Sequence, residues 1–286
     1  LLLAVYIGGL AQPVKAQTKD NLKGEISLSG AFALYPMVVK WAEEFKKIHP
    51  NVRIDISGGG AGKGMTDALA KVVDLGMVSR DVHDVEFKKG AVAFAVVKDA
   101  VVPTVNAANP LIRDIKAKGL KRNVALSLWS GKCKTWGNVL GTTSKVPVHV
   151  YTRSDACGAA ETWAAWFGKR QEDLEGTAVF GDPGVASAVQ KDKVGIGFNN
   201  IAYAYDQKTR RPYAGLAIIP LDVNGNGKID PEENFYDNSL SLIKAIVSGK
   251  YPSPPARNLF LVSNGVPKKP EVIEFIKYIS VSYTHL

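Results

Sequence analysis

Residues 150–163 read Val-Tyr-Thr-Arg-Ser-Asp-Ala-Cys-Gly-Ala-Ala-Glu-Thr-Trp, a pattern that predicts a strand, a short polar loop and the start of a helix. The loop carries Arg153 and Asp155, and we expect the helix to begin near Gly158. The first N–H groups of a helix have no acceptor within it, so such a loop can hold an anion. Arg153 adds a permanent positive charge and a planar set of donors. The stretch therefore predicts one wall of an anion-binding site.

Two earlier stretches repeat this arrangement of strand, small-residue loop and helix. Residues 30–36 lead into an amphipathic helix that ends at 48, and the glycine-rich loop 57–64 precedes a second helix. A strand at 74–78 follows, which completes a βαβ unit and indicates a sheet that is at least partly parallel. The glycine loop lacks the G-x-x-x-x-G-K-[ST] spacing, because its Lys is followed by Gly. We expect a backbone cradle for a small anion or a structural turn there, and no nucleotide loop.

The composition is that of a globular protein with one large domain or two ordinary ones. The chain has 286 residues, 46% of them hydrophobic, and a formal net charge of +9. That excess is spread over the sequence in short pairs, which fits a solvated basic surface or attraction for an anionic ligand or membrane surface. No nucleic-acid-binding module accompanies the charge, so we expect no nucleic-acid partner.

The residues at the two ends of the sequence do not look like parts of the folded domain. Residues 1–10 form an apolar run too short to span a bilayer, and the small residues Val14 and Ala16 follow it. We interpret 1–16 as the remnant of a secretory signal peptide, which predicts a periplasmic or extracellular protein. Residues 280–286 do not continue the helical pattern of 270–279, and we interpret them as a non-native tail.

Cys133 and Cys157 are the two cysteines, and they fit an oxidising compartment. A disulfide between them and two free thiols both remain open, and a free Cys157 at a helix start would have a lowered pKa. Cys157 with a distant histidine would suit an enzyme. However, the sequence has no G-x-S-x-G motif, and its four histidines have no metal-ligand spacing. We therefore expect a protein without enzymatic activity.

Residues 222–233 read Asp-Val-Asn-Gly-Asn-Gly-Lys-Ile-Asp-Pro-Glu-Glu and match the twelve-residue calcium-binding loop, with Gly227 at the position of the sharp turn. The preceding residues, 216–221, read as a strand rather than a helix. We therefore expect a single structural Ca²⁺ site in place of a paired sensor. Its expected ligands are Asp222, Asn224, Asn226, the carbonyl of Lys228, Asp230 and Glu233.

Seven stretches, in their order along the chain, resemble the phosphate-binding proteins of ABC transporters. They are residues 29–45, 56–64, 76–80, 129–136, 153–158, 194–198 and 249–262. The resemblance implies an α/β, two-lobed type II periplasmic-binding-protein fold with a two-strand hinge near 101–106 and 258–263. Lobe 1 would comprise 17–102 and 256–279, and lobe 2 would comprise 103–255.

The same resemblance implies an exported, monomeric solute-binding protein that closes on phosphate or a related oxyanion and delivers it to a transporter permease. The family usually has hydroxyl side chains at several positions where this chain has Ala or Cys. These replacements also fit an alternative, a transport-independent sensor or surface-interaction protein with a non-phosphate ligand. The implied ligand-binding positions are Ala33, Leu34, Tyr35, Gly60, Ala61, Arg80, Asp81, Arg153, Asp155, Cys157, Gly158 and Ala159.

Overall fold

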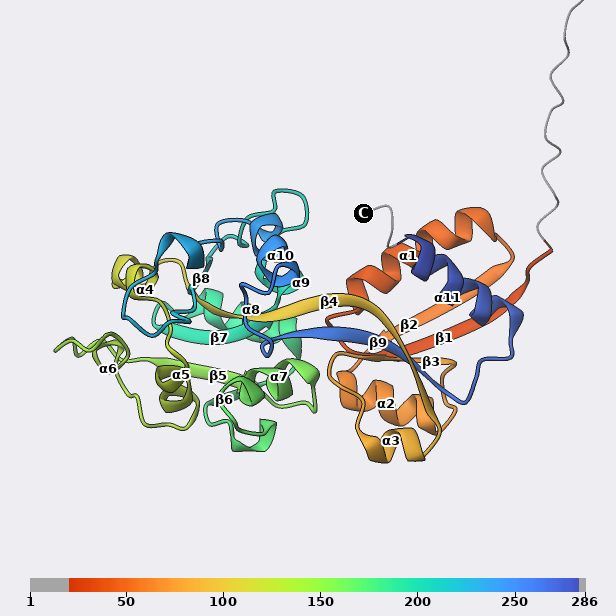
Figure 1. The fold of residues 1–286 in the computed structure, drawn as a ribbon, viewed down its shortest axis with the longest axis horizontal. Coiled ribbons are helices and arrows are strands. Elements are labelled where there is room, and N and C mark those ends of the chain that lie inside the picture. The colour runs from red at the N-terminus through yellow and green to blue at the C-terminus, as the bar shows by residue number, and fades with distance from the viewer. Residues whose placement is uncertain (1–20, 283–286) are drawn as a thin grey trace, which may run out of the picture.

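The computed structural model describes residues 21–282, which form two lobes joined by two long strands (Figure 1). The stretch interpreted as a signal-peptide remnant, 1–16, lies outside the described residues. Within 21–282, no helix combines the length and apolar character needed to cross a membrane.

The elements of lobe 1 are β1 (Gly24–Gly30), α1 (Tyr35–Ile48), β2 (Val52–Gly58), α2 (Ala61–Leu69), β3 (Leu75–Val78), α3 (Asp84–Lys88) and α11 (Pro270–Ser282). The strands β2, β1 and β3 are neighbours and run parallel, as the βαβ pattern predicts. Helix α1 buries one face because Val38, Ala42 and Phe45 recur at helical spacing. Phe45 also packs edge-on against Phe275 of α11, which closes the core from the end of the chain.

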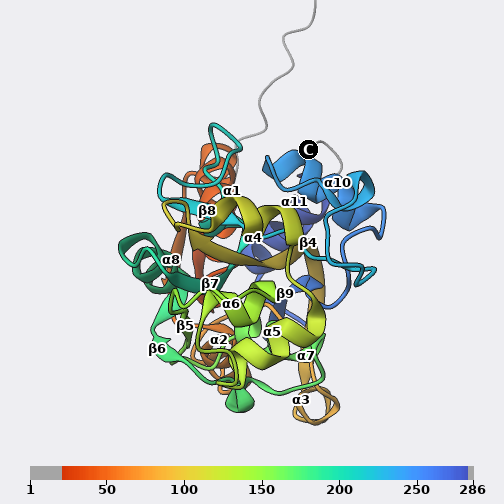
Figure 2. The ribbon, with the colours of Figure 1, turned by 90° about the vertical axis from the view of Figure 1, so that its left-hand side faces the viewer.

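The elements of lobe 2 are α4 (Ile112–Lys118), α5 (Arg122–Trp129), α6 (Trp136–Leu140), β5 (His149–Arg153), α7 (Gly158–Trp166), β6 (Thr177–Val179), α8 (Gly181–Lys191), β7 (Gly195–Asn200), α9 (Ile201–Ala204), β8 (Leu216–Ile218) and α10 (Ser239–Val247). Figure 2 views this lobe end-on, with α4, α5 and α6 towards the viewer. Strands β6, β5 and β7 are parallel neighbours, so their carboxyl ends share one edge of the sheet. Helices α8 and α9 begin within two residues of the ends of β6 and β7, and α7 follows β5 after the loop 154–157.

Aromatic side chains fill the centre of lobe 2. Trp163 of α7 stacks on Phe198 of β7, with ring centroids 5.8 Å apart, and meets Trp129 of α5 edge-on at 5.1 Å. All three side chains are fully buried. This packing fixes α7 against the sheet and therefore fixes where its first turn lies.

Two strands pass from one lobe to the other, β4 (Ala91–Asn106) and β9 (Ala256–Asn264), and they pair antiparallel. The buried residues of β4 change from the lobe 1 core to the lobe 2 core between Val96 and Ala100, and those of β9 change between Ala256 and Leu259. The crossing of β4 thus lies a few residues before the expected 101–106, and that of β9 overlaps the start of the expected 258–263. The sequence also indicates separate strands at 91–98 and 100–106, whereas the structure has one continuous strand.

Helix α11 continues to Ser282, past residue 279 where the helical pattern of the sequence ends. The expectation that the helix stops before 280 is therefore wrong. The rest of the proposed tail, 283–286, lies outside the described residues.

Candidate functional site

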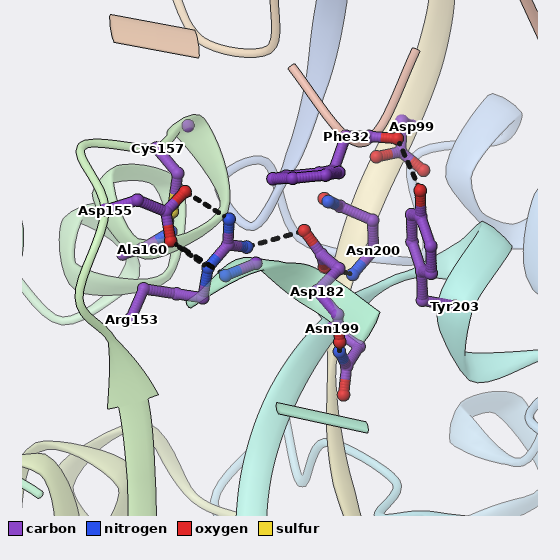
Figure 3. Close-up of polar contacts among 12 residues, drawn as sticks. Phe32, Asp99, Arg153, Asp155, Cys157, Ala160, Asp182, Asn199, Asn200 and Tyr203 are labelled. Atoms are coloured by element: carbon purple, nitrogen blue, oxygen red, sulfur yellow. Dashed lines mark hydrogen bonds and ion pairs between the residues drawn. The ribbon is translucent and has the colours of Figure 1, made fainter. Parts of the chain in front are cut away.

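Arg153 is the last residue of β5, and its side chain is enclosed between two carboxylates (Figure 3). Its Nε and Nη2 atoms donate to the two carboxylate oxygens of Asp155, at 2.8 and 2.6 Å. Its Nη1 atom donates to Asp182 Oδ2 at 2.5 Å. The side chains of Arg153 and Asp182 are each 1% exposed. A guanidinium held by two hydrogen bonds to one carboxylate has a fixed orientation.

Backbone groups at the same sheet edge hold both carboxylates. The N–H of Gly181, at the start of α8, donates to Asp155 Oδ1, and the N–H of Asn200, at the end of β7, donates to Asp182 Oδ1. Burial lowers the pKa of Arg153, but Asp182 and Asp155 outweigh it and raise that pKa above its usual value. Arg153 is therefore a permanent, oriented cation.

Lobe 1 covers this cation with the loop between β1 and α1. The ring of Phe32 lies 5.8 Å from Arg153 Cζ, and its edge meets Phe180 of lobe 2. The hydroxyl of Tyr203 donates to the carbonyl of Phe32 at 3.2 Å (Figure 3). These contacts bring an aromatic face over a guanidinium, an attractive arrangement.

The first turns of α2 and α7 meet across the lobe interface. The N–H of Gly62 donates to the carbonyl of Ala156 at 3.2 Å. A Cβ added to Gly60 would lie 2.7 Å from that carbonyl oxygen, and one added to Gly158 would lie 2.1 Å from the carbonyl oxygen of Ser79. Glycine at 60 and 158 thus allows an approach that no larger residue permits, and the structure has its lobes closed.

A family model described as a PBP superfamily domain matches residues 15–281. The chain belongs to this superfamily. Its relatives include the phosphate-binding protein PstS of Methanocaldococcus jannaschii, 28% identical over 84% of this chain and 67% of that protein. PstS of Bacillus subtilis is 25% identical over 88% of this chain and 76% of that protein.

Solved structures share the fold of this PBP superfamily chain. A phosphate ABC transporter substrate-binding protein with bound phosphate from Clostridium perfringens has a TM-score of 0.70 and 21% identity, over 90% of this chain and 93% of that one. An ABC-type phosphate transport receptor from Vibrio cholerae has a TM-score of 0.62. The two-lobed type II binding-protein fold expected from the sequence is confirmed.

Most of the expected ligand-binding positions lie at the lobe interface around Arg153. Few of them have a side chain that could donate a hydrogen bond to an anion. Ala33, Leu34, Ala61, Cys157 and Ala159 are all buried and lack a hydroxyl. Several backbone donors are also engaged. The N–H groups of Leu34 and Tyr35 bond to Ala31, Gly60 N–H bonds to Gly30, and Cys157 N–H bonds to Gln171.

The backbone donors that suit an anion lie in the first turns of two helices. Ala61 opens α2, and Gly158 and Ala159 open α7, positions where the helix itself offers no acceptor. One helix belongs to each lobe, so both lobes present such donors at the interface.

Arg80 and Asp81 are placed differently from the other expected positions. Arg80 forms two hydrogen bonds to Glu86, at 2.6 and 2.8 Å, and its Nε lies 3.1 Å from Glu161. Arg80 and Asp81 line a separate inter-lobe cavity of about 530 Å³ beside the hinge. Within 21–282, no hydrogen bond or ion pair joins either residue to Arg153, so the structure does not link these two to the other predicted site residues.

Asp182 and a second buried arginine, Arg257, belong to this region and were not predicted from the sequence. Arg257 donates to the carbonyl of Gly158 at 2.8 Å, lies 3.2 Å from Asp99 Oδ2 and also bonds to Asn200. Burial raises the pKa of Asp99 to about 6, against the opposing effect of Arg257. Asp182 lies in the first turn of α8, shortly after β6, and neither of these two elements was predicted from the sequence.

Both cysteines are free thiols in the structure, so the disulfide alternative is not supported. Cys157 caps α7, where its Sγ accepts from the N–H of Ala160 at 3.4 Å. Burial raises the pKa of Cys157 to about 12. The expectation of a lowered pKa at this helix start is therefore wrong, because burial outweighs the nearby positive charge of Arg153. A protonated, buried thiol does not suit a nucleophile.

The predicted calcium loop folds around its own carboxylates. Asp222 accepts from the N–H groups of Gly225 and Gly227, each at 2.7 Å. Glu233 Oε1 accepts from Val223 N–H at 2.9 Å and from Asn224 N–H at 3.1 Å. Across residues 21–282, no three His, Cys, Asp or Glu side chains converge as metal ligands. The amide and carbonyl oxygens of the calcium pattern lie outside that set.

Proposed function

We propose that this chain is the solute-binding protein of an ABC importer and binds phosphate or a related oxyanion between its lobes. The observation that carries this proposal is Arg153, a permanent cation that Asp155 orients at the lobe interface. Membership of the PBP superfamily supports a binding role, and the names of the relatives support phosphate as the first ligand to test.

In this proposal the ligand enters when the lobes separate and stabilises the closed state by contacting both of them. Arg153 supplies the charge, and the first-turn N–H groups of Ala61, Gly158 and Ala159 supply donors. Each hydrogen bond to a charged ligand is worth about 1.5–3 kcal/mol. Asp155 keeps the guanidinium oriented and so reduces the ordering cost of binding.

A permease partner and an exported, monomeric state belong to the same proposal. Support for export comes from residues 1–16, whose pattern is that of a signal-peptide remnant. The second candidate function is a sensor or surface-interaction protein with another ligand. The buried Ala31, Ala33, Ala61 and Ala159 favour it, because none of them offers a hydroxyl to an oxyanion.

Calorimetric titration and thermal melting with phosphate, sulfate, molybdate and tungstate test the ligand. Binding at a concentration of about 100 Kd should stabilise the folded state by about 2.7 kcal/mol. For a chain of this size that corresponds to a rise of about 5 °C or more in the melting temperature. Absence of heat and of a thermal shift with all four anions would contradict oxyanion binding and favour the second candidate.

We also propose that residues 222–233 hold a structural Ca²⁺ ion. All the donor atoms of the loop are oxygens, the type that calcium prefers. Hydrogen bonds from Asn224 and Asn226 to Asp230 gather three of the five ligand side chains. Asp222, Asn224, Asn226, Asp230 and Glu233 would bind through side-chain oxygens and Lys228 through its carbonyl.

A further inference from the structure

Asp182 occupies part of the donor set that an anion on Arg153 would use. A guanidinium has five N–H donors. Asp155 takes two of them, on Nε and Nη2, and Asp182 takes one on Nη1. Two donors remain, so an oxyanion at Arg153 has to share the guanidinium with Asp182 or displace it. Figure 3 shows the two carboxylates on different sides of the guanidinium.

Asp182 is held firmly in this position by lobe 2 itself. Its Oδ1 accepts from the N–H of Asn200 at 2.9 Å, and its backbone carbonyl accepts from the side-chain amide of Asn199 at 2.9 Å. It also lies in the first turn of α8, where a negative charge is favoured. Since Asp182, Arg153 and Asn200 all belong to lobe 2, this contact does not depend on lobe closure.

The charge balance around Arg153 also opposes a bound anion. Its single positive charge faces the two negative charges of Asp155 and Asp182. The next cation, Arg257, is already paired with Asp99. An anion placed beside a fixed carboxylate in a buried site meets like-charge repulsion, which burial strengthens because solvent screening is weak there.

We propose that Asp182 is an affinity-determining residue of this cleft: an internal carboxylate that competes with the bound oxyanion for Arg153. The inference rests on the proposed oxyanion-binding function and specifies how the same site limits affinity. It accounts for a buried arginine that is fully compensated before any ligand arrives. The chain therefore binds its oxyanion more weakly than it would with a neutral residue at 182.

Asp182→Asn tests the inference, because the amide keeps the size of the side chain and an oxygen for the Asn200 N–H while removing the charge. Calorimetry with phosphate and with sulfate should show affinities at least tenfold higher than for the wild type. Asp237→Asn is the matched control, since Asp237 is exposed in the same lobe and the change in net charge is the same. This control should bind as the wild type does.

Equal or weaker binding by a folded Asp182→Asn variant would overturn the competition, while the proposed function would stand if the wild type binds. Absence of oxyanion binding by both proteins would overturn the function and the inference together. Binding by the variant alone would support the inference. Should Asp182→Asn fail to fold, Asp182→Ser places another favourable residue at the helix start and has to meet the same criterion.

Discussion

Arg153 and Arg257 are two buried arginines that the protein compensates in different ways. Arg153 is paired with two carboxylates at the lobe interface, whereas Arg257 shares its donors among Asp99, Asn200 and the carbonyl of Gly158. A buried charge without partners costs several kcal/mol, so each arginine requires its network. Asn200 belongs to both networks, because its N–H holds Asp182 and its side chain contacts Arg257.

Asp99 should make stability depend on pH. Burial raises its pKa from 3.8 to about 6, so the folded protein binds this proton more tightly than the unfolded chain. The stabilisation from Asp99 is therefore full below about pH 3.8 and is lost as the pH rises through about 6. The difference amounts to about 3 kcal/mol.

Urea unfolding of the wild type and Asp99→Asn at about pH 4 and about pH 7 measures this effect. The wild type should lose about 2 kcal/mol relative to the variant between the two conditions, because part of the effect is already lost at about pH 4. The Arg257→Lys variant serves as a comparison, because a positive charge remains beside Asp99 and the Asp99 carboxyl can still titrate. A constant difference between wild type and Asp99→Asn would contradict the raised pKa.

The local sequence pattern predicted only those site residues that lie in the same short segment of the chain. Asp155 lies two residues after Arg153, so one loop sufficed to predict their association. Asp182 lies in another strand–helix unit, and only the parallel pairing of β5 with β6 brings α8 to the same edge. The raised pKa of Cys157 likewise depends on burial by distant residues, which a helix-start argument omits.

At the scale of elements, hydrophobic period located most of the strands, but it did not locate β6 or the helices α3, α4, α5, α6, α8 and α10. In β4, the polar pair Lys98 and Asp99 suggests a break between two apolar runs. The strand continues because β9 pairs with it throughout this segment and Arg257 of β9 compensates Asp99. A tertiary contact thus overrides a local signal.

The calcium loop is an element whose contribution can be measured by itself. The melting temperature in about 1 mM CaCl₂ should be higher than that in a chelator. The expected difference is about 2–4 °C for each kcal/mol by which bound calcium stabilises the folded state. Asp222→Asn should abolish this difference, because Asp222 would supply a buried carboxylate to the ion. Glu232→Gln is the matched control, since Glu232 is exposed in the same loop and is not a proposed ligand. Equal melting of the wild type with calcium and with chelator would contradict the metal site.

At the scale of the whole molecule, two separate cores are connected through β4 and β9. Lobe 1 includes both the early strands and α11, so hydrophobic pattern alone could not define it, and the division came from the family resemblance. The hinge strands carry Asp99 and Arg257, and Arg257 reaches Gly158 at the start of α7. The proposed anion site is thereby connected to the hinge by hydrogen bonds.

Calorimetric titration of phosphate into the wild type and Arg153→Gln is the most direct test of an oxyanion held at Arg153. Arg113→Gln is the control for charge, because Arg113 is exposed on α4. Wild type and control should bind with equal affinity, and folded Arg153→Gln should bind at least about 100-fold more weakly, since it loses charged hydrogen bonds. Undiminished binding by Arg153→Gln would contradict the account.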